Sequence, residues 1–253
     1  MVHGTGEAVP ALDGSVAFNP ARPLHVGHVR GPLTLAVVSI AWLREQAGAA
    51  RAEIEMRHLS EEEAAYAAGL RVPKRRFEWL AGRLAVKHSV CAYRQRHAGA
   101  VTRTREVRIR AVESGLRTGK PLVDGPVEIG LSHSADFAIA ACGPRAIGVD
   151  LELSRAMAPG LAELLAVDGA TDRLAAMSTS LRWACKESVL KYFGFGLRVD
   201  TREVALTRWH ADGRFSWTAG PVLRGHEPSA AEAWRLDSWA GEVDGYSLAL
   251  VWR

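Results

Sequence analysis

The segment Gly148-Val149-Asp150-Leu151-Glu152 alternates apolar and acidic residues in the manner of a β-strand. Side chains two residues apart on a strand face the same way, so Asp150 and Glu152 share one face and Leu151 faces the core. A second segment, Trp183-Ala184-Cys185-Lys186-Glu187-Ser188-Val189-Leu190-Lys191, predicts a helix with Lys191 one turn beyond Glu187 on the same face. Three carboxylates from two elements can hold magnesium and leave room for substrate phosphates. The two segments therefore predict a strand and a helix that meet at a metal site.

Composition indicates a folded protein with a charged partner. The 253 residues are 48% hydrophobic, which is ample for the core of one large domain or two small ones. The net charge of +4 and the sequence pI near 9.2 favour an acidic or phosphorylated partner. The three cysteines, Cys91, Cys142 and Cys185, lack the spacing of a zinc site or a disulfide framework, which favours a reducing cytosol.

No segment predicts export or membrane insertion. Residues 1–23 lack the apolar centre of a secretory signal, and the first thirty residues or so, rich in Gly, Pro and Ala, are expected to form a loosely ordered lead-in. The apolar run Pro32–Trp42 is shorter than the ~20 residues that cross a bilayer. We therefore expect a cytoplasmic protein without a membrane partner.

Helical and strand patterns occur in both halves of the chain. Helices are predicted from Ser60, which begins a capping box, to about Ala68, from Pro73 to about Arg96, around Leu161, and from Leu181 to Phe193. Strands are predicted at Leu33–Trp42, Glu106–Val112, Val127–Leu131, Phe137–Ala141, Ala146–Glu152, Glu203–Trp209, Arg214–Thr218, Ala233–Trp239 and Tyr246–Trp252. The mixture predicts an α+β fold with two similar lobes. We place the boundary at Gly143-Pro144, giving an N-terminal subdomain of residues 1–143 and a C-terminal subdomain of residues 144–253.

Two further motifs, Gly119-Lys120-Pro121 and Leu131-Ser132-His133-Ser134, precede the acidic strand. Together with the strand and the Glu187 helix, in this order, they resemble the Sfp-type 4'-phosphopantetheinyl transferases over roughly half of the chain. The family moves the phosphopantetheine arm of coenzyme A to a serine of an acyl or peptidyl carrier protein and releases adenosine 3',5'-bisphosphate. The resemblance implies two pseudo-symmetric α/β subdomains with the active site in the cleft between them.

The resemblance also implies roles for individual residues. Asp150, Glu152 and Glu187 would bind Mg²⁺, and Glu187 would take the serine proton directly or through a water. Lys191 would balance the charge on the departing bisphosphate. The predicted coenzyme A contacts are Arg76, Arg83, Lys120, Ser132, His133 and Lys191, although the sequence does not decide among Lys74, Arg75 and Arg76.

The resemblance leaves the carrier open, since fatty-acid, polyketide and nonribosomal-peptide systems all use such proteins. The region from Met157 to Met177 is a candidate for carrier docking. A cleft completed within one polypeptide would allow the protein to act as a monomer.

Two other classes of function stay open at this stage. Arg103, Arg105, Arg108 and Arg110 lie on or beside one predicted strand, which would suit a nucleic-acid-binding module. Neither a recognised binding motif nor interleaved aromatic residues accompany them. The other alternative is a scaffold that binds coenzyme A or carriers without catalysis, against which the complete set of acidic residues and Lys191 argues.

Overall fold

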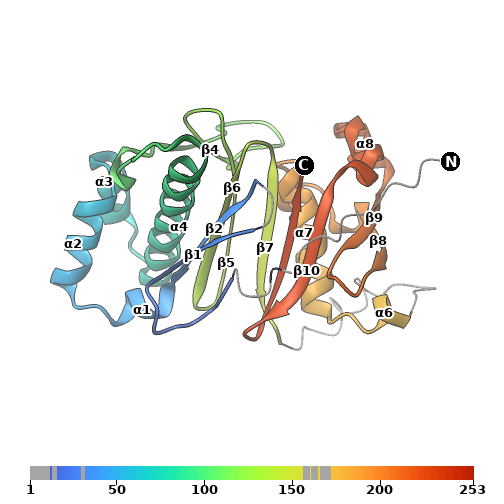
Figure 1. Ribbon diagram of the computed structural model, residues 1–253, viewed down its shortest axis with the longest axis horizontal. Coiled ribbons are helices and arrows are strands. Elements are labelled where there is room, and N and C mark those ends of the chain that lie inside the picture. The colour runs from blue at the N-terminus through green and yellow to red at the C-terminus, as the bar shows by residue number, and fades with distance from the viewer. Residues whose placement is uncertain (1–11, 13–15, 30–31, 156–159, 161–164, 166–171) are drawn as a thin grey trace.

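The computed structural model describes residues 12, 16–29, 32–155, 160, 165 and 172–253. The fold is α+β, with helices and strands in both halves of the chain (Figure 1). The α-helices are α1 (Ile40–Glu45), α2 (Gly48–His58), α3 (Glu61–Gly69), α4 (Pro73–Ala98), α6 (Asp172–Ala175), α7 (Thr179–Tyr192) and α8 (Pro221–His226). Short 3-10 helices are η1 (Thr104–Glu106), η2 (Gly196–Arg198), η3 (Thr201–Glu203) and η4 (Pro228–Arg235).

The strands form two main antiparallel sheets. The N-terminal sheet has the order β1-β2-β6-β5, from β1 (Leu24–His28), β2 (Thr34–Ser39), β5 (Glu128–Ser134) and β6 (Phe137–Gly143). The C-terminal sheet has the order β10-β11-β7, from β7 (Ile147–Leu153), β10 (Asp237–Val243) and β11 (Tyr246–Trp252). Two hairpins complete the strands: β3 (Ile109–Ala111) with β4 (Pro121–Val123), and β8 (Val204–Trp209) with β9 (Phe215–Ala219). The edge strands β5 and β7 of the two sheets lie against each other.

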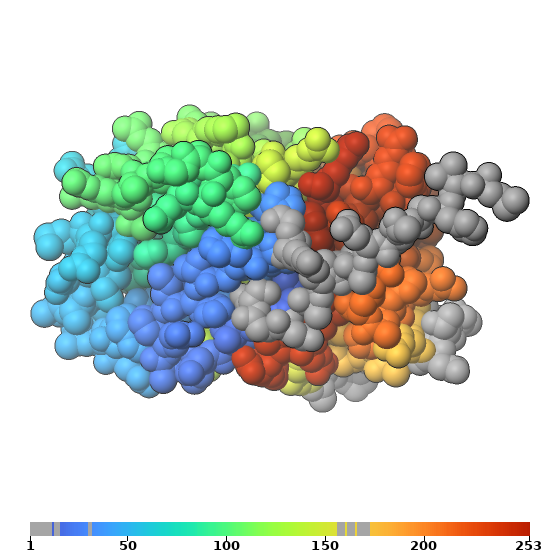
Figure 2. All heavy atoms as spheres, viewed as in Figure 1, coloured from blue at the N-terminus to red at the C-terminus, as the bar shows by residue number. Residues whose placement is uncertain are grey.

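A long helix packs on each main sheet. Apolar residues of α4 such as Leu80 and Leu84 are buried against Ala138 and Ala140 of β6. In the C-terminal half, α7 lies across β7 and β11. A third group of buried residues, including Val149, links the apolar faces of the two sheets. The N-terminal half of the chain occupies one end of the molecule and most of the C-terminal half the other (Figures 1 and 2).

Local sequence explains where the two long helices begin and end. Helix α4 starts with Pro73 at its first turn and stops at Gly99, whose φ of 62° is left-handed. The hydroxyl of Ser178 accepts a hydrogen bond from Leu181 N and caps α7. After α7, Gly194 has a φ of 82°, which turns the chain away from the helix axis. The predicted capping box of α3 is confirmed, because Ser60 and Glu63 exchange both hydrogen bonds.

Several predicted elements differ from those observed. The expected strand Leu33–Trp42 ends at Ser39, because the Ser39 hydroxyl accepts from Trp42 N and caps α1. The expected strand Glu106–Val112 is reduced to β3 behind the turn η1. Part of the expected strand Ala233–Trp239 belongs to η4, and β10 begins only at Asp237. Helix α2 has no counterpart in the prediction, and none of its residues is buried.

The expected subdomain boundary at Gly143-Pro144 falls in the turn between β6 and β7 and stays a prediction. Within the expected lead-in, residues 24–28 form β1, while the side chains of Leu12, Val16 and Phe18 are buried. Residues 1–11, 13–15 and 30–31 lie outside the described residues, as does most of the segment predicted to dock the carrier.

Gly148 lets α7 approach β7 directly. A Cβ atom at this position would collide with the carbonyl oxygen of Ser188 and lie 2.6 Å from the backbone nitrogen of Tyr192. Both atoms belong to the helix backbone and cannot move aside as a flexible side chain could. The absent side chain therefore sets the distance between the strand that carries Asp150 and the helix that carries Glu187.

We expect Gly148→Ala to destabilise the fold by about 3 kcal/mol, since the new methyl group would displace α7 from β7. Urea unfolding followed by circular dichroism measures the change. Gly225→Ala is the matched control, because a Cβ at Gly225 in α8 would meet no atom within 4 Å. Equal unfolding free energies for the two variants would contradict the packing argument.

Two histidines pack together between α2 and α4. The rings of His58 and His88 are 5.1 Å apart, and His58 Nδ1 is 2.7 Å from the hydroxyl of Thr104. Burial, followed by the nearby His58, lowers the pKa of His88 to about 4. The pKa of His58 is also lowered, first by burial and then by Arg57 and Lys87. The folded protein therefore keeps both rings neutral at pH values where the unfolded chain protonates them.

Acidification should destabilise the protein through His88. Between its ordinary pKa of 6.5 and the folded value of about 4, the unfolded state binds the extra proton, so the unfolding free energy falls as the pH is lowered. The slope for one such group reaches about 1.4 kcal/mol per pH unit. Unfolding curves from pH 7 to 4 for the wild type and His88→Gln measure it; identical slopes would show that His88 does not contribute.

Candidate functional site

A central pocket of about 510 Å³ is lined by residues from both halves of the chain. From the N-terminal half it receives the turn Thr118–Pro121 and residues 129–133 of β5. From the C-terminal half come the strand residues Asp150 and Glu152, the helix residues Glu187 and Lys191, and Gly194, Phe195, Gly196 and Arg198 that follow α7. Four of the sequence motifs, separated along the chain, thus meet at one cavity.

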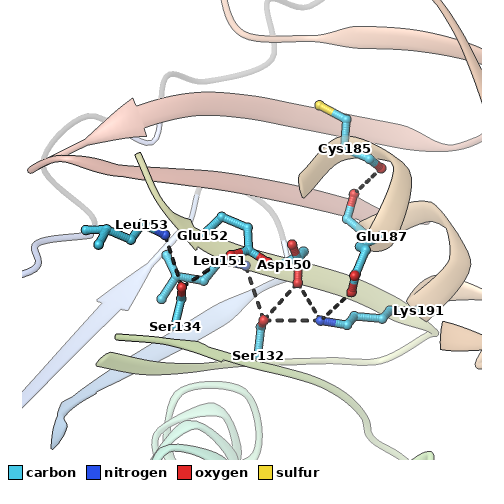
Figure 3. A network of polar contacts seen from close by, with 10 residues as sticks. Ser132, Ser134, Asp150, Leu151, Glu152, Leu153, Cys185, Glu187 and Lys191 are labelled. Atoms are coloured by element: carbon cyan, nitrogen blue, oxygen red, sulfur yellow. Dashed lines mark hydrogen bonds and ion pairs between the residues drawn. The ribbon is translucent and has the colours of Figure 1, made fainter. Parts of the chain in front are cut away.

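Two serine hydroxyls join β5 to β7 beside the carboxylates (Figure 3). Ser132 Oγ donates to Asp150 Oδ1 at 2.9 Å and accepts from Leu151 N at 3.2 Å. Ser134 Oγ repeats the pattern, donating to Glu152 Oε2 at 3.3 Å and accepting from Leu153 N at 3.0 Å. Because both strands repeat every two residues, the serines and the carboxylates stay in register. The hydroxyls connect two strands that belong to different sheets, and they orient both carboxylates.

Lys191 connects the helix to the strand. Its Nζ lies 2.5 Å from Asp150 Oδ1, 3.1 Å from Ser132 Oγ and 3.4 Å from Glu187 Oε2 (Figure 3). Asp150 is 1% exposed, and its second oxygen, Oδ2, is buried without a hydrogen-bond partner. The ammonium therefore offsets the charge of the most buried carboxylate, and one oxygen of that carboxylate is available to a ligand.

The pKa values of the other two carboxylates, Glu152 and Glu187, are raised. Burial, together with the charges of Asp150 and Glu187, raises the pKa of Glu152 to about 7. The pKa of Glu187 is also raised, first by burial and then by Asp150, although Lys191 and a hydrogen bond from Trp183 oppose the shift. Burial lowers the pKa of Lys191, but Asp150 and Glu187 outweigh it and the net shift is upward. Several acidic groups of like charge in one cavity favour a cation or a proton between them.

The other wall of the pocket carries groups that suit phosphate. Lys120 lines the pocket from its turn, although its ammonium is paired with Glu128 at 3.0 Å. His133 also lines it, and burial lowers the pKa of its imidazole. Arg198, which the sequence analysis does not single out, adds a guanidinium from the C-terminal half.

An adjoining pocket of about 280 Å³ shares Gly119, Pro121, Leu131 and His133 with the central one. The predicted coenzyme A residue Arg83 lies here, with its guanidinium 5.1 Å from the centre of the Trp79 ring and one N–H donated to the carbonyl of Ile109. Burial lowers the pKa of Arg83, with Glu63 and Tyr66 opposing the shift. Arg83 therefore lies beside the central pocket rather than in its lining.

The structure separates the three basic residues at the start of α4. Arg75 lines the adjoining pocket with Arg83. Arg76, the residue predicted to contact coenzyme A, instead pairs with Glu55 of α2 at 2.9 Å and lines a different pocket. Lys74 is highly exposed and lies 3.8 Å from Glu78. Of the three basic residues, Arg75 is therefore the one that lines the pocket adjoining the central one.

Seven of the predicted site residues line the central pocket together. They are Lys120, Ser132, His133, Asp150, Glu152, Glu187 and Lys191. Ser134 does not line the pocket, but its hydroxyl orients Glu152. The sequence motif contains Ser134, but no role was predicted for it. The sequence could have indicated this role of Ser134, because Ser132 and Ser134 have the same two-residue spacing as Asp150 and Glu152.

The implied magnesium ion can be tested against these side chains. Among the described residues, no group of three or more acidic, histidine or cysteine side chains converges as metal ligands do, and Lys191 lies between Asp150 and Glu187. The donors nevertheless fit in kind, because carboxylate oxygens are the ligands that magnesium prefers. All three also line one cavity, and Asp150 Oδ2 lacks a hydrogen-bond partner.

The arginines that favour a nucleic-acid module are partly engaged elsewhere. Arg110 pairs with Asp124 at 2.5 Å, and Arg105 lies 3.7 Å from Glu61. The region contains the 3-10 helix η1, with Arg105, and the short strand β3, with Arg110.

Neither a protein-family model nor a curated protein matches this sequence. Among solved structures, the chain is similar to a holo-(acyl-carrier-protein) synthase from Bacillus anthracis in complex with CoA (3',5'-ADP). The two are 21% identical, and the match covers 44% of this chain and 92% of that chain with a TM-score of 0.35. A similarity this low does not transfer a role to any residue here. In the described part of the chain, no helix has the length and apolar character needed to span a membrane.

Lys191→Met should destabilise the fold by about 3 to 5 kcal/mol, because it leaves the Asp150 charge buried without its cation. Urea unfolding at pH 7 measures the loss. The double variant Asp150→Asn/Lys191→Met should recover much of that stability, since it removes both charges. A double variant no more stable than Lys191→Met would show that the ion pair is not what holds this contact.

Proposed function

We propose that the protein is a magnesium-dependent 4'-phosphopantetheinyl transferase that acts on coenzyme A and apo carrier proteins. The observation that supports it best is the central pocket, whose lining combines carboxylates for a metal with lysine and imidazole groups for phosphates. The pocket volume of about 510 Å³ lies within the range of small-molecule sites. The order of the four motifs along the chain, which resembles that of the Sfp-type enzymes, supports the same reaction.

In the proposed reaction, the hydroxyl oxygen of the carrier serine attacks the β-phosphorus of coenzyme A. A new phosphorus–oxygen bond joins the arm to the serine, and the pyrophosphate bond breaks to release adenosine 3',5'-bisphosphate. Glu187 accepts the serine proton, directly or through a water. Burial, followed by the charge of Asp150, raises the pKa of Glu187, which makes this carboxylate a stronger base than an ordinary one.

The positive groups of the pocket would stabilise the charge that develops on the departing bisphosphate. Lys191 already lies at the centre of the site, with its side chain 27% exposed. Lys120 and His133 would bind phosphate groups from the opposite wall, and Ser132 would orient Asp150. Arg75 and Arg83 line the adjoining pocket, where they would add positive charge for a part of coenzyme A that extends beyond the central pocket.

Asp150, Glu152 and Glu187 would hold the magnesium ion, which when bound neutralises pyrophosphate oxygens. Binding a cation here would also relieve the repulsion that raises the pKa of Glu152. We keep the cytoplasm as the proposed location and the monomer as the proposed active form, because one chain supplies both walls of the pocket.

The proposal predicts a mass gain of about 340 Da, the mass of the transferred arm, on an apo carrier incubated with the protein, coenzyme A and Mg²⁺. Mass spectrometry measures the gain, which a chelator should abolish. Carriers from fatty-acid, polyketide and nonribosomal-peptide synthases are tested in parallel, since the structure does not favour one. The absence of a gain on all of them would refute the transferase, and coenzyme A binding without transfer would favour the silent scaffold.

Variants of the pocket assign the residues in the same assay. Asp150→Asn and Glu187→Gln should each lower turnover roughly a hundredfold or more. Lys191→Ala should lower the rate of transfer more than the affinity for coenzyme A. Glu53→Gln is the matched control, because Glu53 is exposed on α2 and pairs only locally with Arg57. Wild-type turnover in both carboxylate variants would place the chemistry elsewhere.

A further inference from the structure

A tight turn carries Lys120 to the wall of the central pocket. Gly115 and Gly119 have φ values of 81° and 86°, which favour glycine. Backbone hydrogen bonds close the turn, from Thr118 N to Gly115 O, from Gly119 N to Val112 O and from Lys120 N to Arg117 O. The turn is rigid within itself, but its position over the pocket depends on what it contacts beyond β3 and β4.

Arg117, in the middle of this turn, crosses to the C-terminal half of the chain. Its guanidinium donates to Glu227 Oε2 at 2.8 Å, between residues 110 positions apart in sequence. The same guanidinium lies 5.7 Å from the centre of the Phe195 ring, and Phe195 lines the central pocket. Arg117 and Glu227 themselves are absent from that lining.

Gly194 lets the turn reach the end of α7. A Cβ atom at Gly194 would lie 2.9 Å from Lys120 Cδ and 3.3 Å from Arg117 Cγ. The side chains of Arg117 and Lys120 therefore pass directly over the backbone three residues beyond Lys191. The turn is therefore held by contacts with Gly194, Phe195 and Glu227 of the C-terminal half.

We propose that Arg117 is a positioning residue for coenzyme A binding, one that holds Lys120 at a set distance from Lys191 by anchoring the turn to Glu227 and Phe195. This inference rests on the proposed function and assigns Arg117 no contact with the ligand. A half-exposed ion pair contributes little to overall stability, so the effect belongs to the pocket rather than to the fold.

Hydrogen exchange tests the anchoring without any ligand. In Arg117→Ala and in Glu227→Gln, the amides of Thr118, Gly119 and Lys120 should exchange roughly tenfold faster than in the wild type, with unfolding temperatures unchanged. Arg235→Ala is the matched control. Arg235 pairs with Glu232 at 2.9 Å and lies 4.9 Å from the Trp234 ring, so it makes the same two kinds of contact, but only with local partners. Unchanged exchange of the turn in Arg117→Ala would overturn the proposal.

Calorimetric titration with coenzyme A tests the consequence. Arg117→Ala and Glu227→Gln should each weaken binding roughly fivefold to tenfold, and Arg117→Lys should restore most of the affinity. Glu227 does not line the pocket, so a loss in Glu227→Gln would act through its neighbours, among which Arg117 connects it to the turn. In a Lys120→Ala background, Arg117→Ala should have little further effect, since both changes remove the same positioned ammonium.

The two proposals fail in different ways. Fully additive losses for Arg117→Ala and Lys120→Ala, or wild-type affinity in Glu227→Gln, would overturn the positioning role while leaving the transferase intact. Failure of the wild-type protein to bind coenzyme A would overturn the proposed function, and with it the binding role of Arg117.

Discussion

The direct packing of α7 against β7 is the contact on which the rest of the site depends. Gly148 has no side chain, so the backbone of α7 at Ser188 and Tyr192 lies against the strand. Glu187 and Lys191 are then held above Asp150, and Lys191 can bridge the two carboxylates. A wider separation would leave Asp150 buried without a cation, which the fold could tolerate only by protonating it. The geometry of the site is therefore set by a backbone contact at the residues that directly follow Glu187 and Lys191 in α7.

The site concentrates charge that a core selected only for stability would exclude. Replacement of a buried ion pair by apolar residues of similar volume often leaves a protein as stable or more so. Here Asp150 is paired with Lys191, but Glu152 and Glu187 face the same cavity with raised pKa values and incomplete compensation. Acidic groups arranged in this way attract a cation, and a bound cation would in turn attract phosphate oxygens. The unfavourable electrostatics of this cluster is thus consistent with a binding role.

Sequence patterns could predict the elements of the site because those elements follow short-range rules. The two-residue period of β7, the capping box of Ser60 and the proline that begins α4 are local signals, and the structure contains each of them. Contacts between distant segments were out of reach. Three consecutive basic residues point about 100° apart on a helix, and the pairing of Arg76 with Glu55 of α2 leaves Arg75 for the pocket. Helix α2, which supplies Glu55, was not predicted from the sequence, and none of its residues is buried.

The two walls of the central pocket are joined at its base and at its rim by different kinds of contact. At the base, Ser132 and Ser134 bind the carboxylates and backbone of β7, where Ser132 and Asp150 are almost fully buried. At the rim, Arg117 meets Glu227 through a pair that is partly exposed to solvent. Water competes for a polar contact at the rim far more than at the base. The buried serine contacts therefore hold the carboxylates firmly, whereas the position of the Lys120 turn depends on a more weakly held ion pair.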